Sequence, residues 1–294
     1  MATVAFLGLG RMGAPMAANL AAAGHQLVLF NRTAAKADAL ASRLGAVAAP
    51  TPRDAVLRAD VVITMLADEE ALLEVCDGEA GVLSGLRPAT IFADMGTTGP
   101  AGVGRLAPRV GAAGGVLVDA PVSGSTAAAE AGTLTILVGA PEESFARVEL
   151  LLAGMGEHVF HLGGTGAGSV MKLAVNNVVY ALGNALSESL VLAERAGLDR
   201  NVVYEVFEHS AIAAPMVGYR HDAFLDPEHT PAAFAMTLAR KDLELITGLA
   251  ASVDLEVEQA QANLSLLSRA IEAGLGEKDM ADVAVYLRGG DAHS

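Results

Sequence analysis

The chain has 294 residues, of which 52% are hydrophobic and 18% charged, so it can bury a large core and is not expected to be disordered. Its formal net charge of −15 and its aromatic content of 4% disfavour nucleic acids and anionic membranes as partners, and no apolar run reaches the roughly 18 residues that cross a bilayer. The single cysteine, Cys76, excludes an intrachain disulfide framework and, with no signal peptide expected, favours a reducing cytoplasmic location.

The first half of the chain alternates between apolar runs and helical patterns. Helical patterns such as 11–24 and 33–45 separate most of the apolar runs, and this alternation is typical of βαβ units in a parallel sheet. The strand-like runs are 3–8, 26–30, 60–66, 90–95, 116–122, 133–139 and 158–163. We therefore expect a doubly wound α/β domain of the Rossmann type over residues 1–163.

The second half shows helical patterns and no strand pattern. The first of these runs from 166 to 196, which is longer than an ordinary globular helix, and it begins where the α/β pattern ends. Shorter helical patterns follow at 199–209, 235–252, 256–273 and 279–287. We expect an all-α domain over residues 164–294, joined to the first domain by the long helix.

The segment "GLGRMG" between the first strand and the first helix has the GxGxxG spacing of a dinucleotide-binding turn. Gly8 permits the tight turn, Gly10 lets a phosphate approach the backbone, and Gly13 lets the helix pack against the strand. The plainer alternative is a tight turn with no ligand. The predicted cofactor-binding loop comprises Gly8, Leu9, Gly10, Arg11, Met12 and Gly13.

The segment "NRT" follows the second strand, where NAD-binding proteins carry an acidic residue that binds the ribose 2′-hydroxyl. Asn31 occupies that place, and Arg32 and Thr33 supply a guanidinium and a hydroxyl that suit a phosphate, with Lys36 one turn into the helix. We therefore predict that NADP(H) is preferred over NAD(H). The alternative for Arg32 is a solvated turn residue.

Two further segments contain side chains that suit catalysis or substrate binding. Lys172 lies near the start of an apolar helical stretch, and Asn176, four residues later, shares its face of the helix. Lys172 is either a partly buried general acid/base, whose pKa is lowered by burial, or a lysine whose ammonium group reaches water. Ser123, Gly124 and Ser125 end a strand and offer hydroxyls and N–H groups to a small carboxylate, or form only a polar loop. None of the seven histidines has a metal-ligand spacing, so no metal is expected.

Four segments together make the chain similar to the β-hydroxyacid dehydrogenase family, which includes 3-hydroxyisobutyrate dehydrogenase, tartronate semialdehyde reductase and glyoxylate/succinic semialdehyde reductases. They are "GLGRMG", "DAPVSG", "GAGSVMKLAVNN" and "KDL", in that order, and they span nearly the whole chain. The resemblance implies a Rossmann domain joined by a long helix to an all-α domain through which subunits pair, as a dimer or a tetramer.

The resemblance also implies roles for residues that spacing alone leaves open. Lys172 is the expected acid/base that moves the carbonyl or alcohol proton, and Asn176 the expected partner of substrate and lysine. Ser123 and Gly124 are expected to bind the substrate carboxylate. The expected neighbours of the cofactor are Met65, Leu66, Thr97 and Lys241, although Lys241 by itself reads as a surface residue paired with Glu244.

Two positions depart from the family pattern, and both bear on substrate rather than on reaction type: Ser125 stands where a second glycine is common, and Gly96 where serine is usual. The sequence thus predicts an NADP(H)-dependent reductase of small carboxylate-bearing aldehydes, or the reverse oxidation of 3-hydroxy acids. The alternatives are an imine reductase-like enzyme, against which Lys172 argues, and a non-catalytic dinucleotide-binding scaffold.

Overall fold

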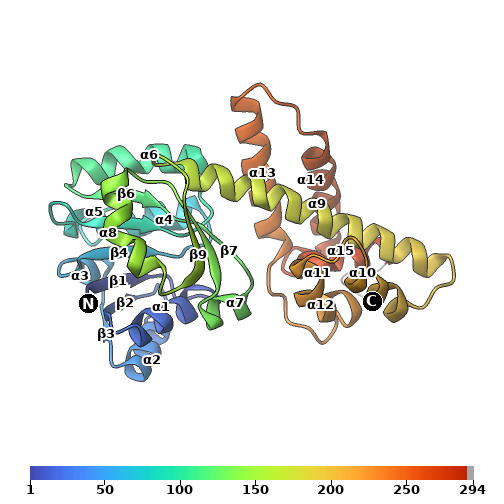
Figure 1. Cartoon of the computed structure of the whole chain (residues 1–294), viewed down its shortest axis with the longest axis horizontal. Coiled ribbons are helices and arrows are strands. Elements are labelled where there is room, and N and C mark those ends of the chain that lie inside the picture. Colours follow the sequence, from blue (N-terminus) through green and yellow to red (C-terminus); the bar gives the residue numbers. More distant parts are fainter. Residues whose placement is uncertain (290–294) are drawn as a thin grey trace. The chain divides into compact units, whose positions relative to one another are not determined.

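A computed structural model describes residues 1–289 (Figure 1). The chain divides into two compact units, residues 1–172 and residues from 173 onward. Residues 290–294, the last of the predicted helical domain, lie outside the described part. Among the described helices, none is both long and apolar enough to cross a membrane.

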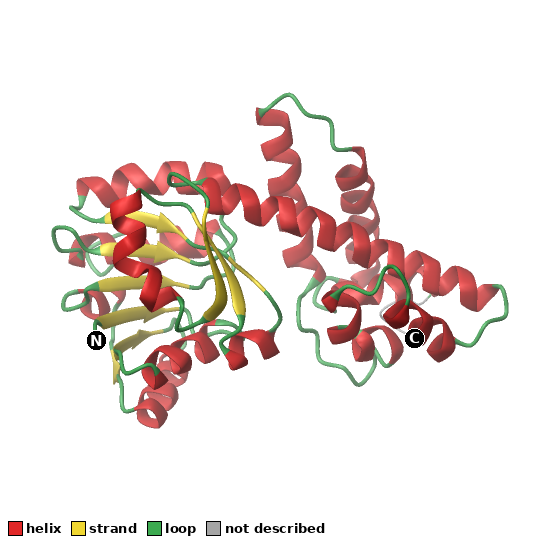
Figure 2. Cartoon of the chain, viewed as in Figure 1, coloured by secondary structure: helices red, strands yellow, loops and turns green. Residues whose placement is uncertain are grey.

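The first unit is built on a six-stranded sheet in which every pair of neighbours is parallel (Figure 2). The strand order is β3-β2-β1-β4-β5-β6, which reverses direction of winding between β1 and β4. The strands are β1 (Thr3–Leu7), β2 (Gln26–Phe30), β3 (Val47–Ala48), β4 (Val61–Thr64), β5 (Ile91–Asp94) and β6 (Val116–Asp119). All four residues of β4 and of β5 are buried, and each strand is apolar up to its last residue, Thr64 or Asp94.

Helices cover both faces of this sheet, and each face has its own apolar core. One core is formed with α1 (Gly13–Ala22), α2 (Ala34–Leu44) and α8 (Glu142–Leu152). The other is formed with α3 (Pro52–Val56), α4 (Glu69–Cys76), α5 (Val82–Gly85) and α6 (Gly99–Ala112). Cys76 is fully buried in the second core, and burial raises the pKa of its thiol to about 12, so it packs rather than reacts.

A separate three-stranded sheet contains the remaining strands, β7 (Val122–Ser123), β8 (Leu134–Val138) and β9 (Gly156–His161), with α7 (Thr126–Ala131) between the first two. β7 and β8 are antiparallel, and β8 and β9 are parallel. The single strand expected over 116–122 is therefore two: β6 ends at Asp119 in one sheet, and β7 begins at Val122 in the other. A proline at position 121, which cannot donate to a sheet ladder, lies at the break.

One long helix, α9 (Ala167–Arg195), begins in the first unit and continues into the second. Its bounds lie within one residue of the range 166–196 that the sequence predicts. The other helices of the second unit are α10 (Arg200–His209), α11 (Pro215–Tyr219), α12 (His221–Leu225), α13 (Met236–Ser252), α14 (Glu258–Ala270) and α15 (Val283–Arg288), with short π- and 3₁₀-helical turns at Ile271–Leu275 and Met280–Asp282. No strand occurs in the described part of this unit.

Candidate functional site

The glycine-rich loop joins β1 to α1, and at two of its positions only glycine fits the backbone and its surroundings. Gly8 has a φ of +98°, and a Cβ added there would lie 2.4 Å from the carbonyl oxygen of Met65. A Cβ on Gly13 would lie 2.0 Å from the oxygen of Gly8, so the helix could not start so close to the strand. At Gly10, by contrast, a Cβ would meet nothing within 4 Å, so the loop is open at the position where a phosphate would approach.

The first turn of α1 is also suited to an anion. No side chain caps this helix, and the helix dipole is positive at its N-terminus. In the first turn the Ala14 N–H donates to the Gly10 oxygen at 3.1 Å, the Met16 N–H donates to the Met12 oxygen at 3.2 Å, and Pro15 has no N–H. The attraction for a pyrophosphate rests on the dipole at this helix start and on the backbone of the glycine loop before it. The loop and the helix therefore fit a dinucleotide.

Asn31 joins the glycine loop to the segment after β2. Its Oδ1 accepts a hydrogen bond from the Leu9 N–H at 3.0 Å, and its Nδ2 donates to the Thr33 carbonyl oxygen at 3.1 Å. The side chains of Arg32 and Thr33 are exposed. Arg32 Nη1 lies 3.8 Å from Glu74 Oε2 on α4, with 84% and 64% of the two side chains exposed, so this ion pair is weak and can be exchanged for another anion.

The carboxyl ends of the next two strands bring further predicted residues to the same edge of the sheet. Met65 and Leu66 follow β4 and contact the glycine loop, where a Cβ on Gly8 would also lie 2.8 Å from Leu66 Cδ2. A Cβ on Gly96 would lie 2.9 Å from the Leu66 oxygen, which accounts for glycine at this position in this chain. Thr97, half-buried, follows in the same loop.

A buried carboxylate holds that loop in place. Asp94 ends β5 and accepts hydrogen bonds from Thr64 Oγ1 at 2.8 Å and from Thr98 Oγ1 at 2.5 Å. The Gly96 N–H also points to Asp94 Oδ1, at 3.4 Å. Sequence reasoning missed Asp94, although an acidic residue that ends an apolar strand is the available signal.

The segment after β6 and β7 contains the predicted substrate loop. Ser123 is half-buried, and Gly124 is exposed with a φ of +143°, a conformation that L-residues rarely adopt. The Oγ of Ser125 accepts a hydrogen bond from the Ala128 N–H at 3.2 Å and so caps α7. Ser125 therefore has a structural role that sequence reasoning did not assign.

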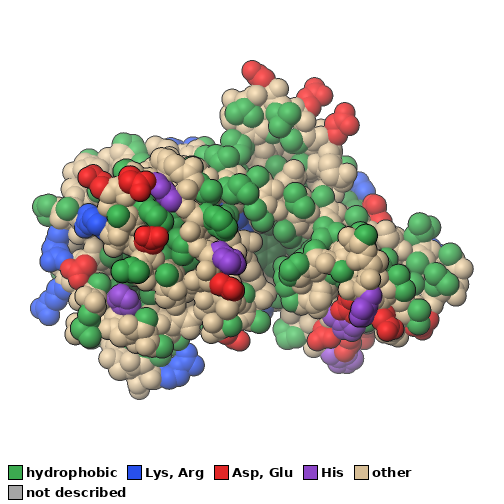
Figure 3. All heavy atoms as spheres, in the orientation of Figure 1, with side chains coloured by type: hydrophobic (Ala, Val, Ile, Leu, Met, Phe, Trp, Pro, Cys, Tyr) green, Lys and Arg blue, Asp and Glu red, His purple; other side chains and the backbone are tan. Residues whose placement is uncertain are grey.

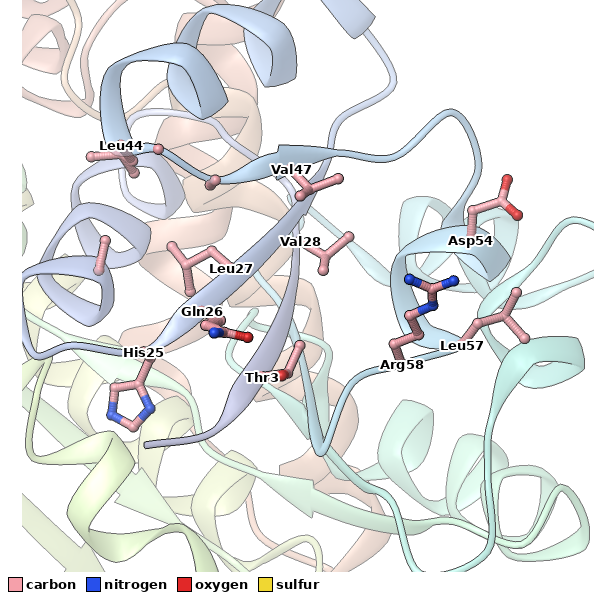
Figure 4. Close-up of a pocket in the computed structure, with 13 residues that line it drawn as sticks. Thr3, His25, Gln26, Leu27, Val28, Leu44, Val47, Asp54, Leu57 and Arg58 are labelled. Atoms are coloured by element: carbon pink, nitrogen blue, oxygen red, sulfur yellow. The ribbon is translucent and has the colours of Figure 1, made fainter.

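A cavity of about 610 Å³ lies at the opposite end of the strands, between the amino ends of β1, β2 and β3 (Figure 4). His25, Arg58 and Asp54 line it together with apolar side chains such as Leu27 and Leu44. Ligands of open parallel sheets bind at the carboxyl ends of the strands, so this cavity is separate from the glycine loop. On the face that Figure 3 draws, acidic, basic and histidine side chains are interspersed among hydrophobic and other residues.

Lys172 lies in the second turn of α9 and is half-buried, and Asn176 lies one helical turn further along. Asn176 is buried, and its Nδ2 donates to Asp242 Oδ2 on α13 at 2.8 Å. A carboxylate can only accept, so the amide must turn its NH₂ group to Asp242 and its oxygen to the other side. That oxygen is an acceptor on the helix that bears Lys172.

Asp242 is the centre of a polar cluster in the second unit. Its side chain is 2% exposed, and it also accepts from Tyr180 Oη at 2.5 Å and lies 2.9 Å from Lys241 Nζ. Burial, and then the charge of Asp242, raise the pKa of Tyr180 well above its usual value. Glu244, the partner first expected for Lys241, lies 3.6 Å from Arg240.

The predicted residues thus form two groups, each joined by contacts within one unit. The glycine loop, Asn31 and Met65–Leu66 are joined in the first unit, and Asn176 and Lys241 meet at Asp242 in the second. Sequence reasoning assigned no role to Tyr180 or to Asp242, although Asp242 lies in the "KDL" segment, because a helical polar side chain is identified as buried only once its partner is known. No group of three or more side chains that could hold a metal is found among residues 1–289.

Two family models match consecutive parts of the chain. Residues 3–163 match the NAD binding domain of 6-phosphogluconate dehydrogenase, and residues 166–287 match the model described as NAD-binding of NADP-dependent 3-hydroxyisobutyrate dehydrogenase. The two matches meet at the start of α9.

Characterised proteins match over the whole chain. Glyoxylate/succinic semialdehyde reductase 2 of Arabidopsis thaliana is 33% identical over 286 residues, covering 97% of this chain and 79% of the relative. The NAD-dependent L-serine dehydrogenase of Pseudomonas aeruginosa is 33% identical over 290 residues, covering 96% and 97%. The structure of Mycobacterium tuberculosis 3-hydroxyisobutyrate dehydrogenase with L-serine is 31% identical, with a TM-score of 0.84 and coverage of 98% and 99%. The chain therefore belongs to the β-hydroxyacid dehydrogenase family of nicotinamide-dinucleotide-dependent oxidoreductases.

Proposed function

We propose that the chain is an NADP(H)-dependent oxidoreductase that interconverts a small carboxylate-bearing aldehyde and the corresponding 3-hydroxy acid, with Lys172 as general acid/base. One observation carries this proposal: Asn176, one turn from Lys172 on α9, is held by the buried Asp242 at 2.8 Å. A fixed amide one turn from a half-buried lysine suits a general acid, which has to be held in position beside the carbonyl it protonates.

Lys172 donates its proton to the carbonyl oxygen during reduction and takes the alcohol proton during oxidation. A bound nicotinamide dinucleotide supplies or accepts the hydride at C4 of its ring. The oxygen of Asn176 accepts from the lysine or from the substrate hydroxyl and keeps the donor in position. Hydride and proton together convert the C=O group into CH–OH, so the step is balanced without a metal.

The substrate carboxylate binds at Ser123 and Gly124, which offer a hydroxyl and an exposed loop N–H. This binding orients the carbonyl carbon for hydride transfer. The names of the relatives support a small substrate with a carboxylate, since they include glyoxylate, succinic semialdehyde and L-serine.

The preference for NADP(H) rests on the exposed Arg32 and Thr33 after β2, with no acidic residue at position 31. The guanidinium of Arg32 is free to turn from Glu74, 3.8 Å away, to a 2′-phosphate. Because the Pseudomonas relative is named as NAD-dependent, both coenzymes belong in the test.

The test is to measure steady-state rates for the wild type and for Lys172→Ala, each with NADPH and with NADH. The substrates are glyoxylate, succinic semialdehyde, tartronate semialdehyde and methylmalonate semialdehyde. We expect turnover of at least one aldehyde, and a fall in kcat of at least about 10²-fold in the variant while NADPH still binds. Lys278→Ala, which removes an exposed lysine of the second unit, is the control. Unchanged turnover in Lys172→Ala would remove the proposed role.

The same panel separates the alternatives. Reduction of an added cyclic imine, without reduction of any aldehyde, would favour an imine reductase. Quenching of NADPH fluorescence without turnover of any compound would favour a non-catalytic scaffold.

We further propose that the second unit self-associates into a dimer or a tetramer. Large apolar side chains are exposed along α9 and α10, among them Val178 at 67%, Leu192 at 72% and Val202 at 57%. Exposed apolar surface of this kind is typical of an interface between subunits. Light scattering that gives the mass of a single chain at micromolar concentration would rule this out.

A further inference from the structure

Asp119 is a buried carboxylate to which the proposed mechanism assigns no role. It is the last residue of β6 and only 1% exposed. Its Oδ1 accepts from the Gly166 N–H at 2.5 Å, and its Oδ2 accepts from the Ser169 N–H at 2.7 Å. Both donors belong to the segment that starts α9, so the carboxylate lies at the N-terminus of the helix that bears Lys172.

The first turn of α9 is seated closely on the ends of two strands. A Cβ added at Gly139, after β8, would lie 2.5 Å from Asp119 Oδ1 and 2.8 Å from the Ala167 nitrogen. A Cβ added at Gly168 would lie 2.2 Å from the Leu137 oxygen. Because Gly139 and Gly168 have no side chains, the start of α9 can pack directly against Asp119 and the ends of the strands. This close packing fixes the position of the helix start.

The electrostatics of Asp119 agree with a fixed helix start. Burial raises the pKa of its carboxyl group, and the N–H groups of Gly166 and Ser169 oppose that rise. An ionised carboxylate at a helix N-terminus is stabilised by the free N–H groups and by the helix dipole. Loss of the charge therefore loosens the first turn.

We propose that Asp119 is a positioning residue for Lys172. Each residue of an α-helix turns the chain by about 100° and advances it by about 1.5 Å, so a slip of one residue in the first turn redirects Lys172 completely. Asp119 also lies four residues before Ser123, so the strand end that holds the start of α9 is the one that leads into the substrate loop. This inference rests on the proposed role of Lys172.

The test is a double-mutant cycle of Asp119→Asn and Lys172→Ala, read as kcat for the best aldehyde and as the NADPH dissociation constant. Asparagine keeps one acceptor but turns an NH₂ group toward an N–H donor. We expect Asp119→Asn to lower kcat by about 10- to 100-fold, the scale for misplacing a reacting group by about 1 Å, with NADPH binding unchanged within twofold. In the Lys172→Ala background the same change should lower kcat no further, because the two residues act as a unit.

A purely structural role predicts a different result. Equal fold-losses in both backgrounds, or wild-type kcat in Asp119→Asn, would overturn the inference. Asp199→Asn is the matched control, since Asp199 caps α10 by accepting from the Asn201 and Val202 N–H groups, and it should leave kcat unchanged. If Lys172→Ala itself keeps full turnover, the proposed function fails, whatever Asp119→Asn does.

A milder variant covers the case in which Asp119→Asn does not fold, as judged by circular dichroism. Ser169→Ala removes the hydroxyl that also hydrogen-bonds to Asp119, and it keeps the N–H donor. We expect a fall in kcat of about threefold that disappears in the Lys172→Ala background, on the scale of a single hydrogen bond. A fall of equal size in both backgrounds, or none in either, would contradict the positioning role.

Discussion

The carboxamide oxygen of Asn31 accepts a hydrogen bond from the backbone N–H of Leu9 at 3.0 Å. Because Nδ2 of the same side chain donates to the Thr33 carbonyl oxygen, Asn31 is a brace between the glycine loop and the "NRT" segment. The brace orders the two segments that would contact opposite ends of the adenosine diphosphate part of a dinucleotide.

The first prediction is that Asn31→Ala weakens both coenzymes equally. Loss of the brace should raise the dissociation constants of NADPH and NADH by a similar factor of about 5 to 10, the scale of one hydrogen bond that orders a loop. Fluorescence titration with each coenzyme measures this. Asn19→Ala is the control, because Asn19 Nδ2 joins α1 to the Ala129 oxygen at 2.7 Å away from the loop. A selective loss of NADPH alone would mean that Asn31 contacts the phosphate directly.

The second prediction concerns the choice of coenzyme. Arg32→Asp should lower NADPH affinity by about 10- to 100-fold and leave NADH affinity within about threefold, because a charge-assisted phosphate contact is replaced by repulsion. The ratio of kcat/KM for the two coenzymes measures it. Arg43→Asp makes the same charge change at an exposed position near the end of α2 and should leave the ratio in place. An unaltered ratio in Arg32→Asp would refute the assignment of Arg32.

Sequence patterns predicted α9 and five of the six strands of the parallel sheet, because these elements are marked by a long helical period or by continuous apolar runs. They missed the two-residue strand β3, and the runs 133–139 and 158–163 form β8 and β9 of the separate sheet. They were insufficient for the break at Pro121, where an uninterrupted apolar run belongs to two sheets. The helices α11 and α12 were missed, since five-residue segments carry too little periodicity to be recognised.

The candidate site was likewise predicted only in part from the sequence. Glycine spacing predicted the loop between β1 and α1, because Gly8 and Gly13 each meet a local steric demand and Gly10 leaves the loop open. The carboxylates Asp94, Asp119 and Asp242 were assigned no role, although the last two lie in the segments "DAPVSG" and "KDL", because each has a partner 30 to 66 residues away and sequence distance gives no sign of that contact. Each of these three buried acids joins segments that are distant in the sequence, and only the fold reveals those contacts.

The third prediction tests the cluster around Asp242. Tyr180→Phe removes the donor 2.5 Å from Asp242 Oδ2 and leaves a buried carboxylate with one bond fewer, which should cost about 1.5–3 kcal/mol of unfolding free energy. Tyr204→Phe is a matched control, since Tyr204 donates to the neutral Val217 oxygen at 2.9 Å and its loss should cost only about 1 kcal/mol. Thermal unfolding of both variants measures the difference. Equal losses would show that Asp242 finds another donor.

The fourth prediction concerns the dependence of stability on pH. Asp282 is 6% exposed, and burial, followed by the charge of Asp279, raises the pKa of its carboxyl group from 3.8 to about 6. Between these values the folded protein binds more protons than the unfolded chain, so this group's contribution to stability falls as the pH rises through that window. Above about pH 6 the penalty is complete and amounts to at most about 3 kcal/mol.

Asp282→Asn removes the ionisation and keeps an acceptor for the Asp279 N–H. The variant should therefore match the wild type near pH 4 and be more stable by about 1–3 kcal/mol at pH 7.5. Thermal unfolding at the two pH values measures this, and Asp254→Asn, at an exposed position, should show no such difference. A gain that is the same at both pH values would mean that the introduced amide packs better than the acid, and that the charge of Asp282 is not what weakens the helical unit at neutral pH.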